Sequence, residues 1–368
     1  MEIVKISPFE GCSLLGMNGG CPESPDGKRM IYAIKDNLLD QETKMILCNT
    51  DLTDHRELCT IKCGNHNGPS ATFIDNSLVV FRDGSEGIGT FIIMDVDTLE
   101  IKYKIRAKES HCAESGKYPF SVDAKFMGKN PEHPEIDTCG IYILDVYTGK
   151  ITLVMTEDEI KQMVSDAGYT ALPNVGAVSH VQLNPSGTSV MMRLGVPECP
   201  VFGALGCKDL LTGKYHIIPD KPVHQLWYDD DTYMATRQFN HYETVDGHET
   251  NIIECETSYL ARFTKDGQEL EVLGGVANHM DGSPDREYFT GDRCYPGYAT
   301  DIYLYKKGSK EPILTIPIPQ NEDTVWVRKV HANPSFSKDG KRIYFNRPDE
   351  FGGSNAYFVD ISAFLDKK

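Results

Sequence analysis

The sequence predicts one all-β domain over residues 1–368, a seven-bladed β-propeller of four-stranded antiparallel blades. Two recurring units predict this fold class. The first unit is a strand, a turn that often contains Asp-Gly, and a second strand. The second is an alternating strand, a short turn and another strand, which is the pattern of a hairpin. The two units alternate along the chain, so each pair forms one four-stranded meander.

The first unit sets the spacing of the blades. Its clear copies are CPESPDGKRMIYA (21–33), NPSGTSVMMRL (184–194), DGSPDREYFTGD (281–292) and NPSFSKDGKRIYFN (333–346), with looser copies at 69–82 and 224–237. The second unit occurs at 45–61, 92–105, 141–155, 208–218, 261–273 and 302–316. Blades are therefore expected to start near residues 20, 69, 117, 180, 224, 279 and 333. Spacings of about 45 to 60 residues favour propeller blades over the alternative, a large two-sheet sandwich.

Three segments depart from the regular repeat. The last blade has only three clear strands, at 333–337, 342–347 and 356–361, so the alternating segment EIVKIS (2–7) is expected to add the fourth and close the ring. Segment 157–169 predicts a short helix between blades three and four. Segment 239–258 predicts an extension of blade five that covers part of one face. Blade three, about 106–156, is the weakest match because its inner strands are hard to place.

Charge and composition restrict the partners. A formal net charge of −17 argues against nucleic acid and anionic membranes, which both require a basic surface. The sequence has no apolar run of membrane-span length, and its N-terminus lacks the pattern of a signal peptide. Its 11 cysteines are scattered without zinc-site spacing, which indicates reduced thiols. We therefore expect a cytoplasmic protein, and nothing in the sequence predicts its oligomeric state.

Histidines recur at one position of the repeat. Six residues before the Asp or Ser of the first turn stand His180, His224 and His279 in three consecutive blades, and Asn333 in blade seven. His331 lies two residues before Asn333, which is on the same face of a strand. Because innermost strands line a propeller channel, we expect these side chains to converge at one mouth. Four imidazoles in nearly one register favour a functional cluster over isolated structural histidines.

Arginines recur thirteen residues later, where the second strand returns to the same end of its blade. Arg82, Arg193 and Arg237 occupy this position in blades two, four and five, and the other blades have Ala33, Asp292 and Asn346 there. Guanidinium forks bind carboxylates in a bidentate manner, so the pattern predicts a site for an acidic ligand. No nucleophile elbow, zinc-protease motif, P-loop or dinucleotide fingerprint accompanies it.

These blade openings resemble those of a known family. The segments SHVQLNPSG (179–187), HQLWYDDD (224–231), NHMDGSPD (278–285) and HANPSFSKDGKRIYF (331–345) are similar to successive blade openings of the oligogalacturonate lyases. The resemblance covers mainly 179–346, about half of the chain. It implies a seven-bladed, cytoplasmic, metal-dependent polysaccharide lyase that acts on short unsaturated pectin fragments.

The resemblance also implies a metal site. That family holds its metal by a histidine that opens blade six and by a Gln-x-x-His-x-His run that opens blade seven. By position these ligands are His279 and His331, whereas Arg328 stands in place of the glutamine and Asn333 in place of the last histidine. Arginine cannot ligate a cation, and an amide is a poor substitute for imidazole. The resemblance therefore implies at most a weak site for a divalent ion such as manganese at His279, His331 and Asn333, or else Arg328 supplies the positive charge directly.

The functional hypothesis is a lyase that cleaves a short uronate-containing oligosaccharide by β-elimination. Such a reaction needs a base with a pKa near neutrality and a positive charge at the substrate carboxylate. We assign the base to His224 and the carboxylate contacts to Arg193 and Arg237. Further substrate contacts are assigned to His180, Arg82 and Arg328. The alternatives are a non-catalytic propeller that binds a sugar or small anion, a protein-interaction scaffold and, less favoured because no hydrolase domain is present, the propeller of a peptidase.

Overall fold

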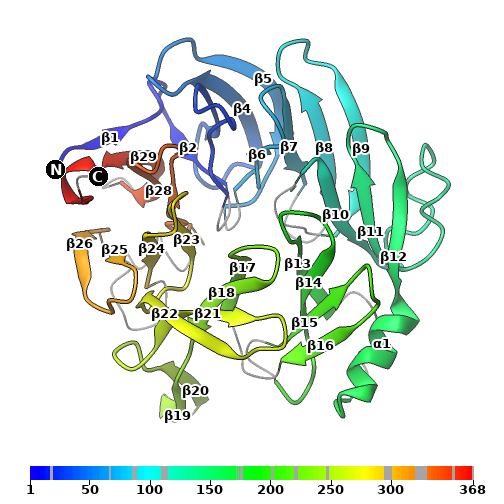
Figure 1. Ribbon diagram of the computed structural model, residues 1–368. Helices are drawn as coiled ribbons and strands as arrows, with labels where there is room; N and C mark the ends of the chain where they lie inside the picture. The colour runs from blue at the N-terminus through cyan, green and yellow to red at the C-terminus, as the bar shows by residue number, and fades with distance from the viewer. Residues whose placement is uncertain are drawn as a thin grey trace. The chain divides into compact units, whose positions relative to one another are not determined.

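The computed structural model describes residues 1–16, 20–65, 68–84, 89–108, 115–170, 172, 174, 177–199, 203–218, 223–245, 248–293, 301–319, 330–349 and 353–366. Its strands form six four-stranded sheets, one three-stranded sheet and a separate two-stranded hairpin, all antiparallel (Figure 1). The seven larger sheets are the blades of a β-propeller, so the predicted fold class is confirmed. The chain divides into two compact units: unit 1 is Met1–Glu86, Phe91–Lys104 and Val272–Lys368, and unit 2 is Gly87–Thr90 and Ile105–Glu271.

Unit 1 contains blades one, six and seven and most of blade two. Blade one is β2 (Cys12–Leu14), β3 (Arg29–Lys35), β4 (Glu42–Asn49) and β5 (Arg56–Lys62). Blade two is β6 (Thr72–Phe73), β7 (Leu78–Asp83), β8 (Gly89–Asp95) and β9 (Ile101–Ala107). Blade six is β23 (Met280–Gly282), β24 (Tyr288–Asp292), β25 (Ile302–Lys306) and β26 (Pro312–Ile316). Blade seven is β27 (Ser335–Phe336), β28 (Arg342–Pro348), β29 (Ser354–Asp360) and the N-terminal β1 (Ile3–Lys5), and a short 3-10 helix, η3 (Ser362–Phe364), follows it.

Unit 2 contains blades three and four and most of blade five. Blade three is β10 (Lys117–Val122), β11 (Gly140–Asp145) and β12 (Ile151–Thr156), and Lys108 adds a single antiparallel bridge to Ser121 of β10. Blade four is β13 (Val178–Leu183), β14 (Ser189–Leu194), β15 (Ala204–Asp209) and β16 (Tyr215–Ile218). Blade five is β17 (Val223–Trp227), β18 (Thr232–Arg237), β21 (Tyr259–Thr264) and β22 (Glu269–Gly275). Between β18 and β21, the predicted extension forms the hairpin of β19 (Asn240–Val245) and β20 (His248–Ile253).

The Ser-x-Asp-Gly turn explains why the first repeat unit folds in the same way in different blades. In blade one, the Ser24 hydroxyl donates to Asp26 at 2.7 Å and accepts from the Arg29 amide at 3.0 Å. Gly27 completes the turn with φ of +68°, a left-handed conformation that glycine adopts without strain. Equivalent Ser-to-Asp bonds of 2.8 and 2.7 Å close the turns of blades six and seven, at Ser283–Asp285 and Ser337–Asp339.

The apolar cores of each unit lie between neighbouring blades. In unit 2, Met191 and Leu205 of blade four pack with Tyr233 and Ala235 of blade five. In unit 1, separate clusters join blade one to blade two, blade six to blade seven, and blade seven to blade one. Each central strand therefore buries both faces, as the uniform burial of Phe289 and its neighbours in β24 illustrates.

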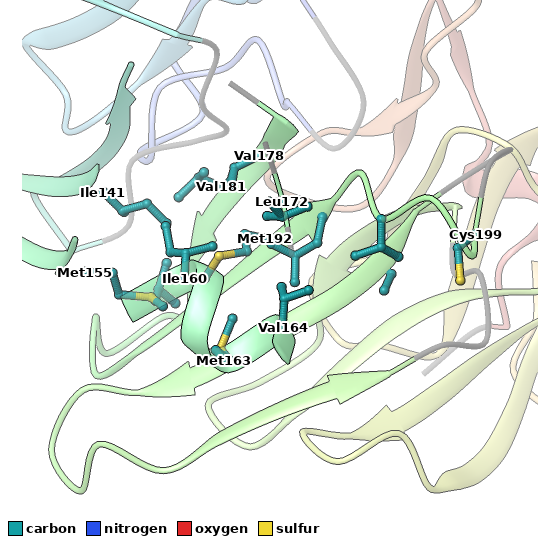
Figure 2. Packing of buried hydrophobic residues seen from close by; sticks show 14 of the residues in the cluster. Ile141, Met155, Ile160, Met163, Val164, Leu172, Val178, Val181, Met192 and Cys199 are labelled. Carbon is teal, nitrogen blue, oxygen red and sulfur yellow. The ribbon is translucent and has the colours of Figure 1, made fainter. Parts of the chain in front are cut away.

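The predicted helix between blades three and four is α1 (Glu157–Asp166). Thr156 caps it through a capping box with Glu159, which satisfies free amide groups of the first turn. Its buried residues Ile160, Met163 and Val164 belong to the core shared by blades three and four (Figure 2). Among the described residues, no helix is long and apolar enough to cross a membrane.

The N-terminal strand completes blade seven, as predicted. Ile3, Val4 and Lys5 of β1 pair with residues of β29 in antiparallel register. The next residue, Ile6, is 1% exposed and its amide donates to the Ala356 carbonyl at 3.0 Å. The first and last segments of the chain are therefore held in one sheet.

Deleting residues 1–8 is expected to lower the free energy of unfolding by about 3 kcal/mol or more. Full burial of one isoleucine contributes roughly 1.5–3 kcal/mol, and each lost backbone bond adds about 0.5–1.5 kcal/mol. Thermal unfolding measures the change. Deletion of Met1 and Glu2 alone, which are both exposed, is the control and should have little effect. A melting temperature unchanged by the longer deletion would contradict the closing role of β1.

Candidate functional site

The innermost strands of blades four and five each carry a β-bulge at the predicted histidine. In β13 the pairing moves from Ser179↔Arg193 to Gln182↔Met191, so His180 lies in the bulge. In β17 the pairing moves from Val223↔Thr236 to Leu226↔Met234, so His224 lies in an equivalent bulge. Bulges re-aim side chains and are frequent beside active sites.

The backbone of both histidines is left-handed. His180 has φ of 51° and His224 has φ of 52°, and Asn333, at the same repeat position of blade seven, has φ of 45°. Positive φ is uncommon outside glycine, although Asn and His tolerate it better than most residues. The repeat position identified from the sequence is therefore a structurally distinct position in three blades. Such conformations cluster at functional sites.

His180 and His224 lie side by side in unit 2. Their ring centroids are 5.5 Å apart with an interplanar angle of 46°. Both side chains are half-buried, so each ring is partly accessible to a ligand. The Nδ1 atom of His180 lies 3.0 Å from the Ser179 hydroxyl, which orients that ring.

Arg193 and Arg237 stand on the strands next to this histidine pair. Arg193 of β14 pairs with Ser179, the residue before His180, and Arg237 follows Thr236, which pairs with Val223. Both side chains are half-buried. Burial lowers the pKa of the Arg193 guanidinium, which nevertheless stays charged at neutral pH. A partly desolvated guanidinium interacts strongly with a carboxylate, because less water screens the pair.

A second cluster, in unit 1, links a carboxylate to two imidazoles. The oxygens of Asp292 lie 3.0 and 2.9 Å from Nδ1 of His279, and Oδ1 also accepts from the His279 amide at 3.2 Å. The Nε2 atom of His279 lies 3.0 Å from Nδ1 of His331. Asp292 is 0% exposed, His279 3% and His331 9%, so this cluster is buried whereas the His180–His224 pair is not.

The geometry of His279 and His331 fits a pair of metal ligands. The 3.0 Å between His279 Nε2 and His331 Nδ1 is the distance of a hydrogen bond, and it is also short enough for both nitrogens to ligate one ion at about 2.0–2.1 Å. A carboxylate that accepts from the other ring nitrogen is the usual support of a ligand histidine, and Asp292 has that position. The described part of the chain contains no group of three or more His, Cys, Asp or Glu able to hold a metal. Asn333 is buried, and Arg328 lies outside the described residues.

Arg82 has a different environment from the other two arginines. It is 4% exposed, and its guanidinium lies over the Phe91 ring, 5.5 Å from the centroid. Its amide donates to the Pro69 carbonyl at 2.9 Å. Arg82 therefore lies beside Pro69, the residue thirteen positions earlier, as the repeat of blade two predicts. A substrate contact from Arg82 remains a prediction.

Two residues with evident roles were not assigned any from the sequence. Asp292 occupies the repeat position that holds arginine in blades four and five. An aspartate at this position, thirteen residues after His279, was the sequence signal that could have indicated a carboxylate partner for that histidine. Asn346, at the same position of blade seven, donates to the His331 carbonyl at 3.1 Å and accepts from the Leu15 amide at 2.8 Å. It thereby links the segment that carries His331 to blade one.

Asp281 joins the openings of blades six and seven. Its carboxylate accepts from the Phe336 amide and from the Gly282 amide, both at 2.8 Å. Burial raises the pKa of Asp281 to about 6, although the two amides, Arg286 and Lys338 all lower it. The Asp281 carboxyl therefore binds a proton more tightly in the folded state than in the unfolded chain.

The pKa of Asp281 predicts a pH-dependent stability. Between pH 4 and 6 the folded state binds more protons at this residue, so its contribution to the free energy of unfolding falls as the pH rises, by up to about 3 kcal/mol. The melting temperature of the wild type relative to Asp281→Asn should accordingly decrease from pH 4.5 to 7.5 in buffer with a chelator. A difference that is constant over this range would contradict the raised pKa.

Comparisons with known proteins agree with this architecture at the level of the fold. Neither a protein-family model nor a curated protein matches the chain. Two solved structures, an oligogalacturonate lyase from Vibrio parahaemolyticus and an oligogalacturonate lyase in complex with manganese, are each 14% identical, with a TM-score of 0.67. The alignment with each covers 99% of this chain and 94% of the other. The resemblance expected from the blade openings is thus confirmed for the fold.

A further solved structure comes from work on two prolyl endopeptidases. It is 11% identical with a TM-score of 0.51, and the alignment covers 98% of this chain but 48% of that one. This chain therefore corresponds to about half of that protein. At such identities the comparisons define the fold alone.

Proposed function

We propose that this protein is a lyase that cleaves a short uronate-containing oligosaccharide by β-elimination. The observation that carries the proposal is the His180–His224 pair, half-buried on equivalent left-handed bulges and flanked by Arg193 and Arg237 on the adjoining strands. A partly accessible imidazole and partly desolvated guanidinium groups are the groups that this reaction requires. The similarity of fold to oligogalacturonate lyases supports the choice of an oligogalacturonate-like substrate.

In the proposed reaction each residue has one role. Arg193 and Arg237 bind substrate carboxylates, which makes the C5 proton of the uronate more acidic. His224 removes that proton through an imidazole nitrogen, the C4–O bond breaks, and a C4=C5 double bond forms. The departing oxygen takes a proton from solvent. His180, Arg82 and Arg328 are proposed to contact other parts of the substrate.

His279 and His331, supported by Asp292, are the residues that would hold a divalent ion such as manganese. When bound, the ion would supply positive charge to a carboxylate as a Lewis acid. The reduced ligand set, with Arg328 and Asn333 at the family's other ligand positions, favours a weak site over a strong one.

The direct test is incubation with defined oligouronides, with absorbance in the ultraviolet used to detect a new C4=C5 double bond. Oligogalacturonides are expected to yield the unsaturated product. No product from pectin, alginate and glycosaminoglycan fragments would contradict the proposal. Calorimetric binding of the same oligosaccharides without turnover would instead support the alternative, a non-catalytic propeller that binds an acidic sugar.

A further inference from the structure

Two buried glutamines connect the bulges that carry His180 and His224. Gln182, the first paired residue after the bulge of β13, donates from Nε2 to the Gln225 carbonyl at 2.7 Å. Gln225, beside His224 in the bulge of β17, donates from Nε2 to the His180 carbonyl at a longer 3.4 Å. Both acceptors are bulge residues, where the regular strand ladder is interrupted. The two side-chain amides therefore tie one bulge to the other.

Gln225 carries a cost that an apolar residue would avoid. Its side chain is 0% exposed, and its Oε1 atom is buried without a hydrogen-bond partner among the described residues. Exchanging the two ends of the amide does not help, because an oxygen would then face the His180 carbonyl. A buried acceptor without a donor destabilises the folded state. The glutamine at this position is therefore unfavourable for stability alone.

We propose that Gln225 and Gln182 are positioning residues that hold His180 and His224 in their left-handed bulges and keep the two rings in contact. The strained backbone persists only where its surroundings determine it, and the reciprocal amide bonds act on both bulges at once. Without them, each bulge can relax toward extended backbone and turn its imidazole away. The consequence for turnover rests on the proposed function, whereas the ring geometry does not.

The test compares two variants that should affect stability differently. Gln225→Met keeps the length of the side chain and removes the unpartnered oxygen, so its melting temperature should be unchanged or higher. Gln182→Met leaves the Gln225 carbonyl without this donor, so its melting temperature should fall. Both variants should nevertheless lower kcat on an oligouronide by about 10-fold or more, with a smaller change in KM, because a misplaced base slows the reaction. Gln162→Met, on the exposed face of α1, is the matched control and should change neither property.

A second measurement separates this proposal from the proposed function. Proton NMR with labelled histidine should show a cross-peak between the His180 and His224 rings in the wild type, since their centroids are 5.5 Å apart, and its loss in both variants. If the wild type has no lyase activity but the cross-peak behaves in this way, the proposed function fails and the positioning role stands. If either folded variant retains the cross-peak and the wild-type kcat, the positioning role is overturned.

Discussion

Replacing His224 with alanine is expected to lower kcat on an oligouronide by at least about 100-fold, the lower end of what a general base contributes. The reason is chemical, since the variant has no group at this position to accept the C5 proton. Binding should persist because the carboxylate contacts are assigned to Arg193 and Arg237. Single-turnover kinetics and calorimetric titration on the same preparations measure the two quantities.

The arginines provide the matched contrast for His224. Arg193→Met or Arg237→Met should weaken substrate binding by about 10- to 150-fold, which corresponds to the 1.5–3 kcal/mol of a charge-assisted pair. Lysine at either position should restore only part of the affinity, because it keeps the charge and loses the bidentate fork. A His224→Ala protein that is less stable but fully active per folded molecule would show that this histidine only packs.

Local sequence rules predicted which residues of different blades share one structural position. The spacing between each blade opening and its turn identified His180, His224 and Asn333 as equivalent, and all three have left-handed backbone. The turn chemistry that defines this spacing lies within a few residues, as the contacts of Ser24 with Asp26 and Arg29 show. For the same reason, the hairpins and the capped helix α1 were predictable from the sequence.

Blade three was hard to place because its opening differs physically from the others. Lys108 makes only a single-residue bridge to Ser121, which belongs to β10, the first full strand of the blade. A bridge of one residue has no alternating pattern to detect. The residues between Lys108 and Ser115 lie outside the described part of the chain, so the expected start of this blade near residue 117 remains a prediction.

The partners of the histidines could not be predicted from strand periodicity. A bulge adds one residue to one strand, which changes the face on which every later side chain emerges. The bond from the Gln182 side chain to the Gln225 carbonyl depends on such local geometry. Arg82 illustrates the same limit, since it shares the repeat position of Arg193 but is buried over Phe91.

Replacing Asp292 with asparagine is expected to disrupt the His279–His331 cluster. Both carboxylate oxygens of Asp292 lie within 3.0 Å of His279 Nδ1, whereas asparagine offers one neutral carbonyl oxygen, so a charge-assisted hydrogen bond becomes an ordinary one and stability should fall by about 1 kcal/mol. A neutral acceptor holds the His279 ring less firmly in its tautomer and orientation, and affinity for manganese should fall by about 10- to 100-fold. Calorimetric titration of the chelator-treated protein with manganese measures the affinity, and thermal unfolding without metal measures the stability. Asp123→Asn is the control, because Asp123 is also a buried carboxylate that accepts from a backbone amide, that of Lys125 at 2.8 Å, and its replacement should leave manganese binding unchanged. Manganese affinity that is equal in the wild type and Asp292→Asn, or undetectable in the wild type, would show that these imidazoles do not hold the ion.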